Sequence, residues 1–82
     1  QFYYSMKFSD LEFEDELFHR AHMSFPNGYG ISVVQFDETE PIYDAAVLKN
    51  GNLCYNTDIT DDVIPGCTEE QIERLMERIS NL

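Results

Sequence analysis

The fold of this chain is decided by the stretch AHMSFPNGYGISV, which spans residues 21–33. Apolar side chains alternate with polar ones on both sides of a central Pro-Asn-Gly, and this period of two is typical of half-buried β-strands. The alternation extends back to Leu17 and forward beyond Val33. We therefore predict a first strand over Leu17–Phe25 and a second over Tyr29–Phe36, paired as an antiparallel hairpin.

Two hairpin registers compete at the Pro-Asn-Gly turn. A two-residue Asn-Gly loop would pair Phe25 with Gly30 and mix apolar with polar side chains on each face. A three-residue loop uses Gly28 as a left-handed bulge residue and pairs Phe25 with Tyr29. The side chains that then share one face are Ala21, Met23, Phe25, Tyr29, Ile31 and Val33. We predict the three-residue register, because a slip of one residue would expose this set.

A second hairpin is predicted around Asn50-Gly51, a dipeptide typical of a type I′ turn. It joins a third strand, Ile42–Lys49, to a fourth, Asn52–Asn56. Its pairing also predicts a second, partly apolar sheet face, whose expected members are Val47, Cys54, Phe18 and Phe36. We expect the aromatic N-terminal stretch or another subunit to cover that face.

The C-terminal segment is predicted to be helical. Residues 57–66 are expected to form an irregular connection, and Thr68 with Gln71 three positions later forms a capping box. Apolar residues then recur at helical spacing to the end of the chain. The predicted fold is α+β: a four-stranded antiparallel β-meander of two hairpins, with one amphipathic helix over residues 68–82 packed on one face.

Length and charge limit the number of domains and the classes of partner that the chain can have. The chain has 82 residues, with 16 Asp and Glu against 5 Lys and Arg and a formal net charge of −11, so we expect a single domain over 1–82. The charge excludes direct, unaided nucleic-acid binding, since phosphates are held by Lys and Arg. We find no membrane span and no secretory signal. Met6 is expected to be the natural start, and residues 1–5 an expression remnant or flexible tail.

No catalytic or cofactor motif is recognised, and we predict a protein that is not an enzyme and takes no cofactor. His19 and His22 follow Glu16 in a pattern that would suit a metal on a helix. On a strand the two imidazoles point to opposite faces, so we predict no metal site.

Two other features, an EF-hand-like spacing of acidic residues and the two cysteines, do not predict a functional site. Counting from Asp58, Glu69 takes the twelfth position of an EF-hand loop, but Val63 stands where that loop needs glycine. We therefore expect turn bonding by Asp and Thr side chains there. The cysteines, Cys54 and Cys67, are predicted to be free thiols. The place of Cys67 before a helix could favour a thiolate, but no histidine lies near it in sequence, so we expect no reactive role.

The acidic residues are grouped along the chain. One group precedes the first strand, a second lies between the second and third strands, a third precedes the helix, and a fourth lies on it. The predicted partner-binding residues come from the first two groups: Glu12, Glu14, Asp15, Glu16, Asp37, Glu38 and Glu40. Such a negative field speeds encounter with a basic protein patch, although the same residues would also keep a protein soluble.

The segments FPNGYGISVV (25–34), YDAAVLKNGNLCY (43–55), ITDDV (59–63) and TEE (68–70) resemble a group of short phage and prophage proteins with no established activity. The resemblance supplies no functional residues. It implies a small accessory protein made in the cytoplasm of a bacterial host. Small acidic phage proteins often inhibit host machinery, so we predict a partner of host or phage origin with a basic patch, in an anti-CRISPR, anti-restriction or DNA-mimic role. The alternatives are a self-associating assembly protein, acting as a homodimer, and a small metal-binding protein.

Overall fold

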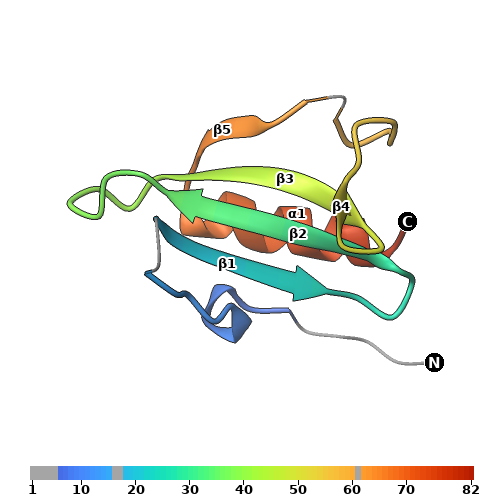
Figure 1. Ribbon diagram of the computed structural model, residues 1–82, viewed down its shortest axis with the longest axis horizontal. Coiled ribbons are helices and arrows are strands. Elements are labelled where there is room, and N and C mark those ends of the chain that lie inside the picture. Colours follow the sequence, from blue (N-terminus) through green and yellow to red (C-terminus); the bar gives the residue numbers. More distant parts are fainter. Residues whose placement is uncertain (1–5, 16–17, 61) are drawn as a thin grey trace.

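The computed structural model describes residues 6–15, 18–60 and 62–82 (Figure 1). The predictions for residues 1–5, Glu16 and Leu17 fall outside these ranges. The elements, in chain order, are a 3-10 turn η1 (Phe8–Asp10), strands β1 (His19–Ser24), β2 (Tyr29–Gln35), β3 (Tyr43–Lys49), β4 (Asn52–Leu53) and β5 (Ile64–Cys67), and helix α1 (Glu69–Ser80). Within the described ranges, no helix is long and apolar enough to cross a membrane.

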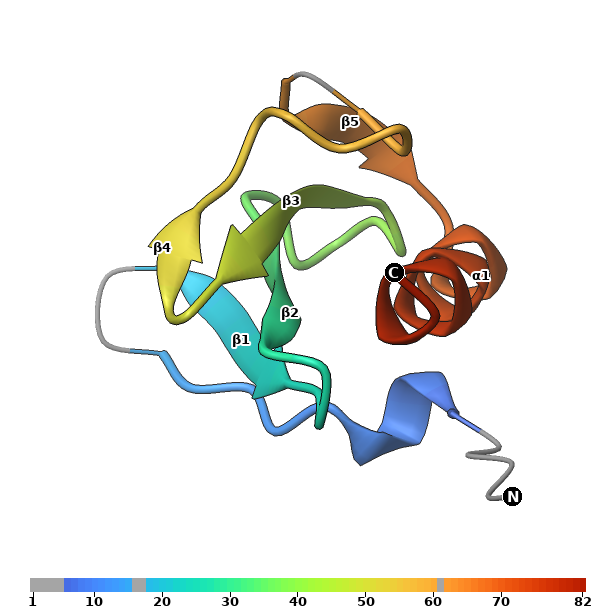
Figure 2. The same ribbon diagram turned by 90° about the vertical axis from the view of Figure 1, so that its right-hand side faces the viewer.

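The predicted α+β architecture is confirmed. The sheet is antiparallel in the order β1-β2-β3-β4, and β5 also pairs with β3. Helix α1 runs along one face of this sheet, so the molecule has two layers (Figure 2). Among the residues that the structure describes, no helix lies on the opposite face of the sheet.

The three-residue register of the first hairpin is also confirmed. Met23 pairs with Ile31 across β1 and β2. The Phe25 amide donates to the Tyr29 carbonyl at 2.7 Å, and the Gly28 amide donates to the Phe25 carbonyl at 3.1 Å. Gly28 has φ +86°, the left-handed conformation that the bulge position requires. The apolar alternation therefore selected the register, as expected from the cost of exposing one whole face.

The second hairpin has the predicted turn but a shorter fourth strand. Asn50 and Gly51 both have positive φ, 52° and 82°, as a type I′ turn requires. Strand β4 ends at Leu53, and the prediction that it continues to Asn56 was wrong. The physical reason is competition for one edge, because β5 pairs with the first half of β3.

Strand β5 lies inside the segment predicted to be an irregular connection. Tyr43 pairs with Cys67 and Ala45 with Ile64, with an irregularity between the two pairs. The Pro-Gly dipeptide between Ile64 and Cys67 indicated a turn. Proline is nevertheless tolerated at an outer edge, where its missing N–H costs no ladder hydrogen bond.

The core lies between the sheet and α1. Its most deeply buried side chains come from β2, β3 and the helix: Ile31, Val33, Val47, Ile72, Met76 and Ile79. The capping box predicted at the helix start is present, since Thr68 Oγ1 accepts from the Gln71 amide at 3.2 Å and Gln71 Oε1 accepts from the Thr68 amide at 2.8 Å. The helix begins and docks as its sequence predicts.

The composition predicted for the second apolar face was partly wrong. Val47 pairs with Ile31, so it lies on the helix side, and Cys54 belongs to the same core. Phe18 and Phe36 lie on the open face, where their rings meet edge to face with centroids 5.1 Å apart. We define the open face by its apolar and aromatic members: Phe18, Val34, Phe36, Ala46, Leu53, Tyr55 and Val63.

The described part of the N-terminal stretch does not cover the open face. Leu11 is buried in the core, and Phe8 and Phe13 pack against it. The Phe8 amide donates to Glu73 Oε2 on the helix at 2.6 Å. The segment therefore closes the side of the core beside α1 (Figure 2).

Replacing Ile72 with alanine tests this packing. The Ile72 side chain is 0% exposed between helix and sheet. Ile72→Ala is expected to lower the free energy of unfolding by about 2–5 kcal/mol, because it removes buried methyl groups and leaves a cavity. Chemical denaturation measures the change. Glu77→Ala, on the exposed side of α1, is the control and should change stability by less than about 0.5 kcal/mol. Equal effects of the two variants would contradict the packing.

Candidate functional site

The topology brings two of the predicted acidic groups to the same end of the sheet. His19 opens β1 and pairs with Gln35, which closes β2. The segment that leads into β1 and the loop that leaves β2 are therefore neighbours, although more than twenty positions separate them in sequence. Gln35 is buried there, and its side-chain amide donates to the Glu40 carbonyl at 2.7 Å, which holds this loop against the sheet.

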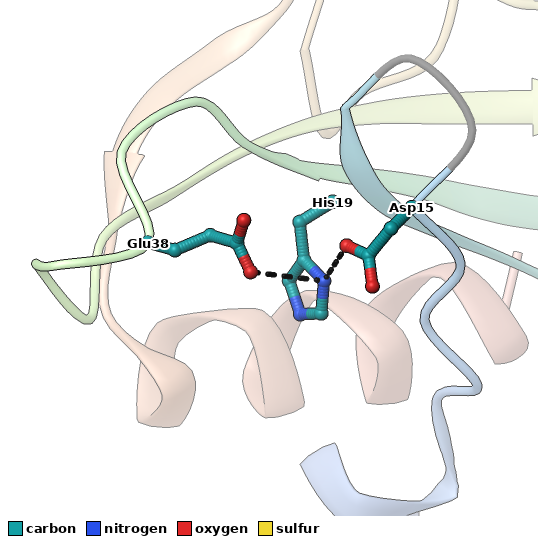
Figure 3. A group of neighbouring side chains, drawn as sticks. All are labelled: Asp15, His19 and Glu38. Atoms are coloured by element: carbon teal, nitrogen blue, oxygen red, sulfur yellow. Dashed lines mark hydrogen bonds and ion pairs between the residues drawn. The ribbon is translucent and has the colours of Figure 1, made fainter.

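A histidine joins the two acidic groups. His19 Nδ1 lies 2.6 Å from Asp15 Oδ1 and 3.6 Å from Glu38 Oε1 (Figure 3). The imidazole stacks on the Phe13 ring, with centroids 4.5 Å apart and an interplanar angle of 9°. The imidazole is thus held by an aromatic ring, while both carboxylates stay largely exposed. We call Asp15, His19 and Glu38 the acidic junction.

The other predicted residues of the first group have separate roles. Glu14 and Arg20 form a short bridge, with backbone bonds in both directions and a Glu14 Oε1 to Arg20 Nε distance of 3.0 Å. Glu12 is exposed. Glu16 lies outside the described residues.

The residues of the second group lie in the exposed β2–β3 loop. Asp37 accepts hydrogen bonds from the side chain and the amide of Thr39. These bonds hold the pKa of the Asp37 carboxyl below its usual value, because they stabilise its charged form. Glu38 reaches toward the acidic junction, and the Glu40 side chain is exposed.

Helix carboxylates extend the same acidic end, which the sequence could not show. Glu69, in the first turn of α1, lies close enough to the phenol of Tyr43, at the start of β3, to raise its pKa. Glu70 in the same turn pairs with Arg74 at 2.6 Å. The helix thus starts beside the β2–β3 loop (Figure 1). Acidic side chains in its first turn stabilise the helix, because its N-terminal end carries the positive end of the dipole.

The third acidic group performs the turn bonding expected of it. The Val63 amide donates to Asp62 Oδ1 at 2.7 Å, and the Asp62 amide donates to Thr60 Oγ1 at 3.1 Å. Asp61 lies outside the described residues. These bonds shape the chain before β5.

Cys67 does not offer an activated thiolate in this structure. Cys54 and Cys67 are free and buried. Burial raises the pKa of the Cys67 thiol, and the nearby negative charge of Asp44 adds to the effect. The helix start therefore does not lower the pKa of Cys67.

No family model, no curated protein and no solved structure matches this chain. The resemblance to short phage proteins therefore stays a prediction.

The raised pKa values predict how stability depends on pH. Burial raises the pKa of Tyr43 above its usual value, and Glu69 raises it further; burial also raises the pKa of the Cys67 thiol. The unfolded chain therefore loses these protons at lower pH than the folded chain, and stability falls as pH rises above about 9. Thermal melts from pH 7 to 11 measure this.

Tyr43→Phe should flatten that decline above about pH 10, because the phenol no longer titrates. Tyr55→Phe removes the hydroxyl of an exposed tyrosine and is the matched control. A Tyr43→Phe profile identical to the wild-type profile would contradict the assignment.

Proposed function

We propose that this chain is a non-enzymatic binding protein that docks its acidic end onto a basic patch of another protein. One observation carries the proposal: two acidic segments that are remote in sequence meet at the acidic junction, where Asp15 and Glu38 share His19. Exposed carboxylates at one end of a small scaffold speed encounter with a positive surface.

The distribution of positive charge supports this reading. Arg20 and Arg74 each pair with a glutamate, and Lys49 lies over the Tyr29 ring, 5.3 Å from its centroid, beside the β3–β4 turn. That turn lies at the opposite end of the sheet from the β2–β3 loop (Figure 1). The β2–β3 loop itself carries Asp37, Glu38 and Glu40 and no lysine or arginine, so its own charge is negative.

The biological setting is proposed from the resemblance to phage and prophage proteins. In that setting the chain acts in the cytoplasm of a bacterial host as an accessory protein. Its partner is a host or phage protein, and its effect is inhibition of a host defence or nucleic-acid enzyme, of the anti-CRISPR, anti-restriction or DNA-mimic type. The net charge of −11 supports contact with a protein and not directly with nucleic acid or a membrane.

The test is a neutralisation experiment with a matched control. Glu38→Gln with Glu40→Gln removes two charges at the acidic end, and Asp58→Asn with Glu77→Gln removes two charges elsewhere. A partner purified from bacterial host lysate is titrated against all three proteins at low and high salt. We expect about two- to thirtyfold weaker binding for the first variant only, since each of the two exposed charge pairs contributes about 0.2–1 kcal/mol. We also expect wild-type binding to weaken with salt.

Equal losses in both variants would contradict docking at the acidic end. So would an affinity that salt does not change.

The second candidate function is self-association, and the open face favours it. Phe36 is 63% exposed and Leu53 58% exposed on that face. Contiguous exposed apolar surface of this kind often marks an interface between proteins. A dimer through this face would bury these apolar side chains.

Light scattering distinguishes the two candidates. A stable dimer that Leu53→Glu converts to monomer would favour self-association. Leu82→Glu, at an exposed position outside the open face, should leave such a dimer intact. A wild-type monomer at all accessible concentrations would contradict self-association.

A further inference from the structure

The acidic junction has the donor set of a metal site as well as that of an ion pair. One nitrogen of His19 and one oxygen each of Asp15 and Glu38 all lie within 4.8 Å of one another. The three residues come from three separate places: the segment before β1, the start of β1, and the β2–β3 loop. Figure 3 shows Asp15 and Glu38 on either side of the His19 ring, each joined to Nδ1 by a dashed line.

The spacing of these atoms suits a small tetrahedral ion. Zinc binds histidine nitrogen and carboxylate oxygen at about 2.0–2.2 Å, so two ligands of one tetrahedral zinc lie roughly 3.4 Å apart. The distances from His19 Nδ1 to the two carboxylates, 2.6 and 3.6 Å, bracket that value. Both carboxylate side chains are largely exposed, so they are free to turn toward a bound ion.

The histidine distinguishes this group from a simple acidic patch. An imidazole nitrogen suits zinc, copper and nickel, whereas calcium and magnesium take oxygen ligands. Stacking on Phe13 fixes the plane of the imidazole, and Asp15 holds its Nδ1. His19, the ligand that would make the site selective for zinc-type ions, is thus also the ligand that the fold holds in place.

We propose that Asp15, His19 and Glu38 form a binding site for one zinc-type divalent ion. Three protein ligands leave the fourth position of a tetrahedral ion to water. The ion would connect the segment before β1 to the β2–β3 loop and offset part of the negative charge of the acidic end. This proposal does not rest on the partner-binding function, because it needs only the residues of this chain.

The sequence pattern of Glu16, His19 and His22 suggested a different set of metal ligands from the one proposed here. His22 follows His19 in the motif, but it is exposed on the open side of β1, while His19 lies on the helix side. The metal ligands proposed here include Glu38, nineteen positions after His19. Only the hairpin register brings Glu38 close.

The test is a titration of the chelator-treated chain with Zn²⁺ by calorimetry. We expect saturation at one ion per chain for the wild type and for His22→Ala, the matched control. His19→Ala and Glu38→Gln should each weaken binding by more than about tenfold, since even outer partners of metal ligands contribute 10- to 100-fold. Glu38→Gln keeps the side-chain size at an exposed position, so its loss of binding cannot be attributed to misfolding.

A second readout identifies the ligand atom. On addition of Zn²⁺, the ring nitrogen signals of His19 should move in an ¹⁵N spectrum, while those of His22 stay in place. Three results would overturn the proposal: no saturable Zn²⁺ binding by the wild type at about 0.1 mM, binding that His19→Ala leaves unchanged, or binding that only His22→Ala abolishes. Mg²⁺ at the same concentration should produce no shift of His19, and an equal shift would contradict a nitrogen-selective site.

Discussion

The register of the first hairpin is the constraint on which the rest of this structure depends. Gly28 sets it with a positive φ of 86°, and the apolar faces of β1 and β2 hold it. The turn is also tied to its surroundings: the Asn27 side-chain amide donates to the Ile79 carbonyl at 2.8 Å, near the end of α1, and the Asn50 amide donates to the Gly28 carbonyl at 2.8 Å. Both turns and the end of the helix thus meet at one end of the molecule.

The opposite end follows from the same register. Because Met23 pairs with Ile31, His19 pairs with Gln35, and the acidic segments on either side of the hairpin emerge together. Like charges so close would repel each other. Exposure to water reduces that cost, because water and salt screen charges at the surface. The scaffold therefore concentrates negative charge without placing a carboxylate in its core.

Much of the fold follows from local signals in the sequence. The alternation from Ala21 to Val33 and the capping box at Thr68 each depend on residues close in the chain, and both predictions are confirmed. The prediction of which sheet face carries Val47 was wrong. That face depends on how β3 pairs with β2 across the acidic loop, and no turn motif fixes this pairing. Strand β5 was missed for a similar reason: its partner β3 lies well before it in the chain, and the Pro-Gly dipeptide within it indicated a turn.

The candidate site, too, combines features that local sequence predicts with features that depend on tertiary pairing. The acidic segments could be recognised from composition, but the partnership of Asp15 with Glu38 depends on tertiary pairing, and the stacking of His19 on Phe13 has no signature in the sequence. Histidine spacing suggested His22 as a partner, which strand geometry excludes. Residues that act together here are neighbours across a sheet and not along the chain.

The central claim is that one hairpin register brings the acidic segments together, and contacts between α-protons measured by NMR test it most directly. In the observed register His22 faces Ser32 and Arg20 faces Val34 at positions between the hydrogen-bonded pairs, where opposing α-protons come closest. We therefore predict strong contacts between the α-protons of His22 and Ser32 and between those of Arg20 and Val34. Contacts shifted by one residue, with His22 opposite Val33, would contradict the account.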